Sequence, residues 1–443
     1  MSTVSPARKV AFSILKTMER FGHSDTLLRG RNVEVLSEPD RNLTTALVLG
    51  VLRCQIELDR RIRALLKHPN AKLDVEVLVA LRLGAYQLLR MDRIPARAAI
   101  DESVELTKEA GHRFASGMVN AVLRKLAVSP KDEMGGDTLE NCRTGYPGWM
   151  IDRWIETYGE DHACEICRHG QKQPQLCLRL GSDEVEQELE SEGIELAPGK
   201  FLLAARRLIA GDVSKTAAFR SGRVRIQDEG SQLIAELAPR GQKLLDCCAA
   251  PGGKTLILGE RNIEGEIIAC DDSHLRLAEL QKRLRVLGER VQCLLADATH
   301  LDPEGAFDVA LADVPCSGTG TLGRNPEIRH RLQAENLTRQ SERQRAILNS
   351  ALHAVRPGGF VLYSTCSLEP EENEQVIETA LADHSAARLV SLKSRIEELG
   401  SEGIVSHTGS ERLLPCVTVQ GALRLLPGVF ETDGFFAALI QVS

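Results

Sequence analysis

The second half of the chain constrains the fold most, because short apolar segments alternate there with helical ones. From residue 226 onward the apolar segments are KLLDCC, GEIIACDD, VQCLLAD, FDVALADVP and GFVLYSTCS, and longer stretches with helical spacing separate them. Such alternation predicts a parallel sheet with helices on both faces. Ligands of these sheets bind at the carboxyl ends of the strands, so we expect the functional residues there.

The rest of the chain is organised differently. Residues 5–127 place apolar side chains three and four positions apart, which is typical of helices, and they lack strand-like alternation. Residues 129–145 are polar and contain glycine, which indicates a linker. The sequence therefore predicts an all-α domain over 1–135, a small α/β subdomain over 141–225, and an α/β Rossmann-like domain over 226–443.

The distribution of charge along the chain favours RNA binding more than the net charge of the whole chain does. The net charge of -7 argues against a nucleic-acid partner, because binding to phosphates requires Lys and Arg side chains. Residues 1–140, however, contain 22 Lys and Arg against 18 Asp and Glu, and the basic residues are densest over 59–67 and 82–97. Charge alone is equally typical of solvated helix faces.

Composition excludes several classes of protein. With 43% hydrophobic and 26% charged residues, the chain is typical of globular proteins. The N-terminal residues lack a secretion signal, and no apolar run approaches the ~18 residues of a membrane span. Twelve cysteines without framework spacing indicate reduced thiols. We expect a cytosolic protein without a membrane segment.

The stretch DCCAAPGGKT, residues 246–255, follows the first predicted strand and resembles a phosphate-binding loop. A P-loop needs glycine five residues before Gly253, where Cys248 stands, and G-x-G-x-x-G is absent. What remains is a tight glycine turn at a strand–helix junction, which can approach a nucleoside closely. A purely structural turn explains the stretch equally well when it is considered alone.

Acidic residues follow the next three predicted strands. Asp271 stands 18 residues after Gly253, in the range where a carboxylate accepts ribose hydroxyls, and Asp297 and Asp313 end the third and fourth strands. One such residue is commonly a helix cap. Three of them beside a glycine turn predict one nucleoside site, and without a pyrophosphate motif S-adenosylmethionine fits better than NAD.

Two cysteines, Cys316 in LADVPCSGTG and Cys366 in YSTCSLEPEEN, follow the fourth and fifth strands. Carbon 5 of a pyrimidine becomes nucleophilic only after a thiolate adds to carbon 6, while a carboxyl group near N3 protonates the ring and a base later removes the C5 hydrogen. Asp313 precedes Cys316 by three residues, so the pattern suits this chemistry. The residues alone leave open which cysteine attacks.

Metal chemistry is less well supported. A zinc deaminase carries H-x-E and P-C-x-x-C, whereas PCSGTG has no second cysteine. The stretch HACEICRH, residues 162–169, spaces Cys164 and Cys167 two apart, but it has helical spacing and no remote second pair. We expect no metal site. For the remaining cysteines, a buried and inert thiol is the ordinary interpretation.

The motifs DCCAAPGGKT, ADVPCSGTG, NPEIR, YSTCSLEPEEN and DGFFAA together resemble the bacterial ribosomal RNA small-subunit methyltransferase B family, which makes 5-methylcytidine in 16S rRNA. The likeness covers most of the chain. RNLTTALVLGVLRCQIELD and SGMVNAVLRKLA are similar to the NusB-like RNA-binding domain of that family, and RIQDEGSQL resembles the entry to its catalytic domain.

The resemblance implies a role for each candidate residue. It implies that the cofactor loop beneath the methionine part of S-adenosylmethionine consists of Cys248, Ala249, Ala250, Pro251, Gly252, Gly253 and Lys254. Asp271 is implied to hold the ribose, Asp297 to lie near the adenine, and Asp313 to face the target base. Cys366 is implied to be the nucleophile and Cys316 the residue that assists release.

Two positions depart from the family pattern: His330 stands where a tryptophan is expected after NPEIR, and Gly181 where an asparagine is expected after LRL. Neither belongs to the implied chemistry. The prediction is a monomeric RNA cytosine-C5 methyltransferase that uses S-adenosylmethionine and acts on 16S rRNA. The alternative is a NusB-like RNA-binding or ribosome-assembly factor with a vestigial methyltransferase domain, against which the intact Asp313, Cys316 and Cys366 count.

Overall fold

A computed structural model describes residues 4–20, 22–129, 139–302 and 304–443. The chain divides into two compact units, of which the first comprises residues 1–173 and 322–331 and the second residues 174–321 and 332–443. The predicted end of the first domain, at residue 135, lies outside the described residues. In the described ranges no helix is both long and apolar enough to cross a bilayer.

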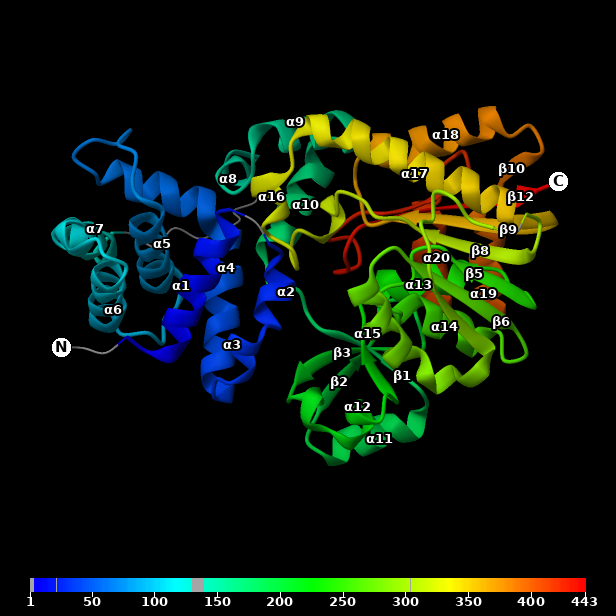
Figure 1. Ribbon diagram of the computed structural model, residues 1–443, viewed down its shortest axis with the longest axis horizontal. Coiled ribbons are helices and arrows are strands. Elements are labelled where there is room, and N and C mark those ends of the chain that lie inside the picture. The colour runs from blue at the N-terminus through cyan, green and yellow to red at the C-terminus, as the bar shows by residue number, and fades with distance from the viewer. Residues whose placement is uncertain (1–3, 21, 130–138, 303) are drawn as a thin grey trace. The chain divides into compact units, whose positions relative to one another are not determined.

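The first unit is helical, and it contains the range that was predicted to be all-α (Figure 1). It also includes residues 141–173 and 322–331, which were predicted to lie in the small α/β subdomain and in the Rossmann-like domain. Its helices are α1 (Pro6–Met18), α2 (Ser24–Leu28), α3 (Arg31–Glu34), α4 (Glu38–Ala64), α5 (Val75–Arg90), α6 (Ala96–Glu109), α7 (Ser116–Ala127), α8 (Leu139–Arg143), α9 (Gly148–Tyr158), α10 (Glu160–Gln171) and α16 (Ile328–Arg331). The apolar faces of α1, α4, α5, α6 and α7 form one core. The helices approach closely at Gly84, where a Cβ atom would lie 2.6 Å from Leu123 Cδ1.

Residues 322–331 belong to this helical unit although the chain on both sides of them belongs to the other. Arg329 is buried among the helices, with its guanidinium 4.1 Å from the centre of the Tyr146 ring. The guanidinium donates hydrogen bonds to backbone carbonyls of separate stretches: Arg53, Gly145, Gly170 and Leu322. These bonds use both terminal nitrogens of the guanidinium, which offsets the cost of burying its charge. The segment thus joins α4 to the chain around α9 and α10.

The second unit begins with a small antiparallel sheet of strands β1 (Cys177–Leu180), β2 (Glu195–Pro198), β3 (Ala205–Ala210) and β4 (Val224–Ile226). The strand order is β2-β3-β1-β4, and every neighbouring pair is antiparallel. Helices α11 (Asp183–Ser191) and α12 (Ala217–Arg220) accompany it, and leucine and valine side chains of α11 and β1 form a core of their own.

The large sheet has the strand order β10-β12-β9-β8-β5-β6-β7, with β11 paired to β12. Its strands are β5 (Lys243–Asp246), β6 (Glu266–Asp271), β7 (Val291–Leu295), β8 (Phe307–Asp313), β9 (Val355–Thr365), β10 (Ala387–Val390), β11 (Leu423–Leu425) and β12 (Phe435–Val442). The predicted strands β5 to β9 are confirmed as parallel neighbours. The alternation did not indicate β12, which pairs antiparallel with β9 and extends the sheet.

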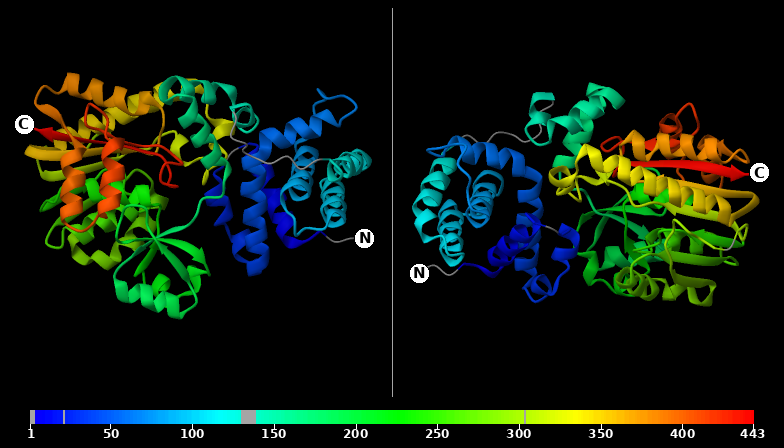
Figure 2. Two further views of the ribbon diagram at one scale, coloured as in Figure 1. Left: turned by 180° about the vertical axis from the view of Figure 1, so that it is seen from behind. Right: turned by 45° about the horizontal axis from the view of Figure 1, so that its top comes forward.

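Helices cover both faces of this sheet (Figures 1 and 2). Leu244, Leu311 and Leu362 point to the face of α13 (Glu229–Leu237), α19 (Leu392–Ser401) and α20 (His407–Leu413). Their neighbours Leu245, Ala310 and Val361 point to the face of α17 (Ala334–Ala354) and α18 (Glu374–Asp383). Helices α14 (Gly253–Arg261) and α15 (His274–Leu284) pack together beside β6. Apolar side chains on both faces explain the continuous apolar runs in the sequence.

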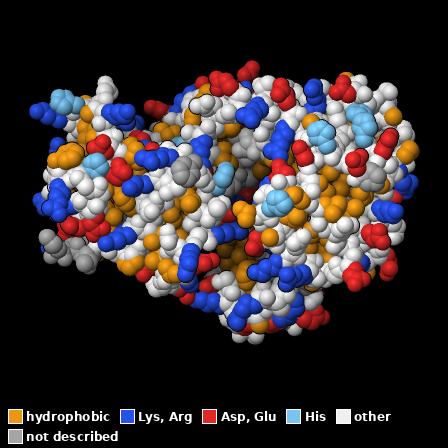
Figure 3. Space-filling model, in the orientation of Figure 1, with side chains coloured by type: hydrophobic (Ala, Val, Ile, Leu, Met, Phe, Trp, Pro, Cys, Tyr) orange, Lys and Arg blue, Asp and Glu red, His pale blue; other side chains and the backbone are white. Residues whose placement is uncertain are grey.

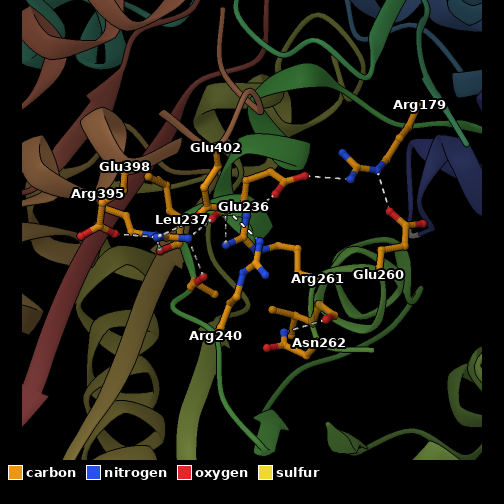
Figure 4. Close-up of polar contacts among 12 residues, drawn as sticks. Arg179, Glu236, Leu237, Arg240, Glu260, Arg261, Asn262, Arg395, Glu398 and Glu402 are labelled. Carbon is orange, nitrogen blue, oxygen red and sulfur yellow. Dashed lines mark hydrogen bonds and ion pairs between the residues drawn. The ribbon is translucent and has the colours of Figure 1, made fainter. Parts of the chain in front are cut away.

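A network of buried ion pairs joins the small sheet to the helices of the large one (Figure 4). Glu236 of α13 pairs with Arg179 of β1 at 2.7 Å and with Arg261 of α14 at 2.6 Å. Arg395 of α19 donates to the carbonyl of Leu237 at 3.2 Å, at the carboxyl end of α13. Basic side chains stabilise that end of a helix because they satisfy its free carbonyls.

Glu236 therefore offers a test of the network. We expect Glu236→Ala to lower the free energy of unfolding by about 3–5 kcal/mol, because it breaks two buried ion pairs. Arg261 would keep only Glu402 at 3.9 Å, and Arg179 only the more exposed Glu260. Urea unfolding followed by circular dichroism measures the change. Glu398→Ala is the matched control, since this carboxylate also pairs with Arg395 but its side chain is 60% exposed. An exposed pair contributes about 0–1 kcal/mol; equal losses in the two variants would contradict this account.

Candidate active site

The candidate residues gather at one edge of the large sheet. Strands β7, β6, β5, β8 and β9 are parallel neighbours, so their carboxyl ends meet there. All the residues singled out in the sequence follow those ends: Cys248, Ala249, Ala250, Pro251, Gly252, Gly253 and Lys254 after β5, Asp271 at the end of β6, Asp297 after β7, Asp313 and Cys316 at and after β8, and Cys366 after β9.

The glycine turn lies between β5 and α14. Gly252 has φ +98°, a backbone conformation that favours glycine, and a Cβ atom there would lie 2.9 Å from Leu280 Cδ1. The turn therefore fits closely against α15, and α14 begins at the next residue, Gly253. Backbone N–H groups at the start of a helix lack partners within the helix.

Two acceptors beside this turn remain open. Neither Oδ1 of Asp246 nor Oε1 of Gln227 has a hydrogen-bond partner among the described residues, although both atoms are buried. Gln227 lies 3.2 Å from the position of a Cβ atom on Gly253, and Asp246 accepts a hydrogen bond from Thr255 through Oδ2. Burial raises the pKa of Asp246 to about 7. Open acceptors suit the ammonium group of S-adenosylmethionine, so the residues present fit that cofactor.

The two acidic residues on the next strands already have roles in their own turns. Asp271 is buried and accepts at Oδ1 from Ser273 N at 2.9 Å and from Arg276 at 3.2 Å, whereas its Oδ2 bonds to no described residue. Asp297 accepts from the backbone N and the hydroxyl of Thr299, which lower its pKa. The assignments to ribose and adenine thus remain predictions. Both carboxylates use only Oδ1 in these contacts, and Asp271 differs from Asp297 in being buried.

Asp313 is held between two donors. Ser364 Oγ donates to its Oδ1 at 2.7 Å, and Lys254 Nζ donates to its Oδ2 at 2.6 Å. Burial lowers the pKa of Lys254, but the adjacent Asp313 charge outweighs burial and the pKa lies above the ordinary value. Lys254 thus connects the glycine turn with the strand of the cysteines, and its ammonium contacts a carboxylate rather than extending into solvent.

The two cysteines are in direct contact. The Sγ atoms of Cys316 and Cys366 lie 3.3 Å apart, and neither residue is exposed. The hydrogen bond with Cys366, together with burial, raises the pKa of the Cys316 thiol well above its ordinary value. The environment therefore disfavours the ionised form of Cys316, and either sulfur can donate the hydrogen bond between the two.

Comparison with known proteins identifies the family. The family described as 16S rRNA methyltransferase RsmB/F matches residues 234–441, the NusB family matches 5–128, and an RsmF/B-like ferredoxin-like domain matches 146–211. The ribosomal RNA small subunit methyltransferase B of Vibrio cholerae is 31% identical, with 98% of this chain and 97% of the relative covered. The chain belongs to this methyltransferase family. The Bacillus subtilis protein named probable ribosomal RNA small subunit methyltransferase B is also 31% identical, over 96% of each chain.

Solved structures agree with this family. The crystal structure of PH0851 has a TM-score of 0.79 and 25% identity, and the match covers 99% of both chains. A methyltransferase homologue from Pyrococcus horikoshii has a TM-score of 0.55 and 30% identity, over 68% of this chain and 97% of that one. The predicted architecture is confirmed: a NusB-like helical domain, a ferredoxin-like connecting domain, and the fold of S-adenosylmethionine-dependent methyltransferases.

The two positions that depart from the family pattern have packing roles. His330 is largely buried, a ring nitrogen lies 2.7 Å from the Leu52 carbonyl, and burial lowers the pKa of the ring to about 4. The neutral ring can donate the hydrogen bond. Gly181 donates from its N–H to the Arg223 carbonyl, and a Cβ atom would lie 3.2 Å from that oxygen. A bulkier residue at 181 would require the chain at Arg223 to shift.

The cysteines of residues 162–169 lie in the helical unit, on α10. Tyr146 donates a hydrogen bond to the Cys167 carbonyl at 2.9 Å, and the Cys142 thiol lies 4.0 Å from the Cys164 carbonyl. Hydrogen bonding with Cys167 lowers the pKa of Cys142 to about 6. Within the described ranges, no group of three His, Cys, Asp or Glu side chains is arranged to hold a metal ion.

Several contributors to the site were missed in the sequence. Asp246 and Glu372 stand within the motifs DCCAAPGGKT and LEPEEN, but neither was given a role. The contacts of Ser364 and Lys254 with Asp313 join residues 51 and 59 positions apart. The spacing of residues cannot signal such contacts, which depend on the order of the strands.

The spare oxygen of Asp271 leads to a test of cofactor binding. We expect Asp271→Ala to weaken S-adenosylmethionine binding roughly tenfold to a hundredfold, because a charge-assisted hydrogen bond contributes about 1.5–3 kcal/mol. Isothermal titration calorimetry measures the dissociation constant. Asp272→Ala is the control, since this neighbouring carboxylate pairs with Arg276 and Arg343 at a more exposed position. Unchanged affinity in Asp271→Ala would leave Asp271 as a turn residue only.

Proposed function

We propose that this protein transfers the methyl group of S-adenosylmethionine to carbon 5 of a cytidine in 16S ribosomal RNA. The observation that carries the proposal is the thiol pair, with its sulfur atoms 3.3 Å apart at the strand edge that also carries Asp313 and the glycine turn. Methyl transfer to a heteroatom needs no cysteine nucleophile. Transfer to carbon 5 of a pyrimidine needs one, together with a carboxyl group and a base.

In the proposed reaction Cys366 forms the covalent bond. Its sulfur adds to carbon 6 of the cytosine while Asp313 supports protonation at N3, and carbon 5 becomes nucleophilic. The bound cofactor supplies an electrophilic methyl group, and the residues of 248–254 with Asp271 and Asp297 hold it. A proton must then leave carbon 5 so that the bond between carbon 6 and the Cys366 sulfur can break.

Cys316 assists that last step. The Cys366 sulfur is the main reason why Cys316 keeps its proton, and that influence ends once the sulfur is bound to carbon 6. Cys316 can then release its proton to solvent and accept the proton from carbon 5. The two thiols thus act in sequence.

The proposal assigns RNA binding to the helical domain over 1–135, a connecting role to 141–225 and the chemistry to 226–443, in a monomeric cytoplasmic enzyme. Exposed basic residues of the helical unit include Arg60, Arg63 and Lys67. Others in the basic stretches are neutralised: Arg82 pairs with Asp59 at 2.6 Å. On the face drawn in Figure 3, basic side chains of this unit lie among acidic ones.

The alternative function is RNA binding or ribosome assembly without catalysis. The NusB-like helices would suffice for it, and the second unit would then be vestigial. Incubation with labelled S-adenosylmethionine and unmodified 16S rRNA, followed by mapping of the label, separates the two functions. Label on carbon 5 of a cytidine supports the enzyme, and no transfer supports the assembly factor.

The order in which the two thiols act is tested by trapping the covalent complex between protein and RNA. We expect Cys366→Ala to abolish both methylation and the protein–RNA adduct, because carbon 5 never becomes nucleophilic. Cys316→Ala should form the adduct, transfer the methyl group and then stall. Denaturing electrophoresis with RNA and cofactor reveals the adduct as a shifted band. A band in Cys366→Ala and none in Cys316→Ala would reverse the assignment, and full activity in both would exclude the covalent mechanism.

RNA binding by the helical unit is tested at its exposed basic residues. We expect the triple variant Arg60→Ala, Arg63→Ala, Lys67→Ala to bind RNA more weakly, with a slope of log affinity against log salt that is smaller by about 2–3, because each phosphate contact releases counterions. Filter binding at several salt concentrations measures both quantities.

The matched control removes the same charge from the second unit, by Lys243→Ala, Arg388→Ala and Lys393→Ala. Equal losses in the two triple variants would contradict the assignment of RNA binding to the helical domain. Deleting residues 1–140 is a less suitable test, because Arg329 and His330 would lose the carbonyls of Arg53 and Leu52.

A further inference from the structure

The carboxylate of Glu372 is a buried charge at the site to which the reaction above assigns no step. Glu372 ends the short helical turn Pro370–Glu372, which follows β9 and precedes α18, and the residue has 0% of its surface exposed. An ionised carboxylate at such a position is costly unless several donors satisfy it. Its partners therefore indicate what it is for.

Four donors converge on this carboxylate. Oε1 accepts from the Ser317 backbone N–H at 2.8 Å and from Gln344 Nε2 at 3.0 Å, and Oε2 accepts from the hydroxyls of Ser317 and Ser367. The two hydroxyls also lie 3.0 Å from one another. With two acceptor bonds on each oxygen, the carboxylate is well satisfied inside the protein.

The positions of these donors in the chain are informative. Ser317 directly follows Cys316, and Ser367 directly follows Cys366. Gln344, on α17, also donates to the carbonyl of Pro315, the residue before Cys316. The chain is thus held on both sides of Cys316, and through Ser367 the same carboxylate holds the residue next to the other cysteine.

Backbone hydrogen bonds join the chain on both sides of Cys316 to the chain around Cys366, but they do not involve the thiol groups. Val314 N donates to the Ser364 carbonyl at 3.0 Å, and Gly320 N donates to the Cys366 carbonyl at 2.9 Å. A Cβ atom on Gly320 would lie 2.4 Å from the Gly434 carbonyl oxygen, so the backbones meet closely there. Residues 315–319 turn between these two contacts, and the Glu372 carboxylate connects the middle of that turn to the chain after β9.

We propose that Glu372 is a positioning residue that holds the Cys316 and Cys366 sulfur atoms in contact. The contact itself does not depend on the reaction. The catalytic meaning of the contact rests on the proposed function, because two thiols that act in sequence on adjacent carbons of one base must both stay within reach of it. Glu372 is fully buried and acts through Ser317 and Ser367, the residues that follow the two cysteines.

Two substitutions at Glu372 distinguish an effect of its shape and contacts from an effect of its charge. Glu372→Gln keeps the shape: its amide oxygen can accept from Ser317 N–H and Gln344, and its amide N–H₂ can donate to the two serine hydroxyls, which turn to accept. Glu372→Ala removes the connection altogether. If the residue positions the sulfur atoms, the glutamine variant should behave as the native protein does and the alanine variant should not.

The first experiment measures sulfur contact without RNA or cofactor. Diamide oxidises two neighbouring thiols to a disulfide and takes up the two hydrogens, and mass spectrometry of peptides gives the rate for the Cys316–Cys366 pair. We expect that rate to fall about tenfold or more in Glu372→Ala and to stay within about threefold in Glu372→Gln, since small displacements strongly affect such encounters. Glu378→Ala, an exposed carboxylate on α18, is the matched control and should leave the rate unchanged.

Three results would overturn the proposal: an unchanged rate in Glu372→Ala, an equal loss in Glu372→Gln, which would assign the effect to charge, or an equal loss in Glu378→Ala. Circular dichroism establishes that each variant is folded. If Glu372→Ala does not fold, the double variant Ser317→Ala, Ser367→Ala removes the hydroxyl contacts and keeps the carboxylate. It should also slow disulfide formation, and a native rate there would overturn the proposal.

The second experiment tests whether positioning by Glu372 also affects turnover. With RNA and cofactor, we expect Glu372→Ala to form the covalent adduct but to resolve it about tenfold more slowly, and Glu372→Gln to resolve it within about threefold of the native rate, because release requires both thiols on one base. If the native protein forms no adduct, the proposed function fails, whereas the disulfide rates still decide the role of Glu372. If adducts form and Glu372→Ala resolves them at the native rate, the positioning role in turnover is wrong.

Discussion

The pairing of β8 with β9 is the contact on which the site depends. It sets Asp313 opposite Ser364, so the hydroxyl of one strand donates directly to the carboxylate of the other, and the next residues of both strands continue into the loops of Cys316 and Cys366. Side chains alternate between the faces of a sheet, and a slip of one residue would turn Asp313 away from its partner. Leucine and valine side chains packed on both faces hold that register.

The same register explains how distant motifs come to form one site. Lys254 belongs to the glycine turn after β5, and β5 is the other neighbour of β8, so its ammonium can bridge to Asp313. The glycine turn and Asp313 are therefore linked by an ion pair, and these are the residues predicted to hold the cofactor and to face the base. Beyond the cysteine loop the chain enters the helical unit at residues 322–331. There Arg329 donates hydrogen bonds to backbone carbonyls of separate stretches.

Much of this arrangement could be predicted from the sequence, and the parts that could not share a physical reason. Short apolar runs between helical stretches indicated β5 to β9, and strand ends indicated Asp271, Asp313 and both cysteines. The run FFAALIQV of β12 is apolar except for Gln441, and such a run specifies neither the direction of a strand nor its neighbour, so the antiparallel pairing with β9 was not foreseen. Glu372 was not foreseen because a glutamate in LEPEEN is ordinarily solvated. Its burial depends on four donors, of which Ser317 is 55 residues away.

The proposed order of action of the two thiols agrees with the raised pKa of Cys316. Sulfur atoms 3.3 Å apart share one hydrogen bond, and the pKa of Cys316 lies far above its ordinary value chiefly because of Cys366. A thiolate rather than a thiol attacks carbon, and both burial and the contact with Cys366 disfavour the ionised form of Cys316. In the proposed reaction Cys366 bonds to carbon 6, so its sulfur no longer raises the pKa of Cys316, and the second thiol becomes easier to ionise at the step that needs a base. In the proposed reaction, therefore, the bond that begins the reaction also prepares the group that ends it, and this coupling requires that the two sulfur atoms stay in contact.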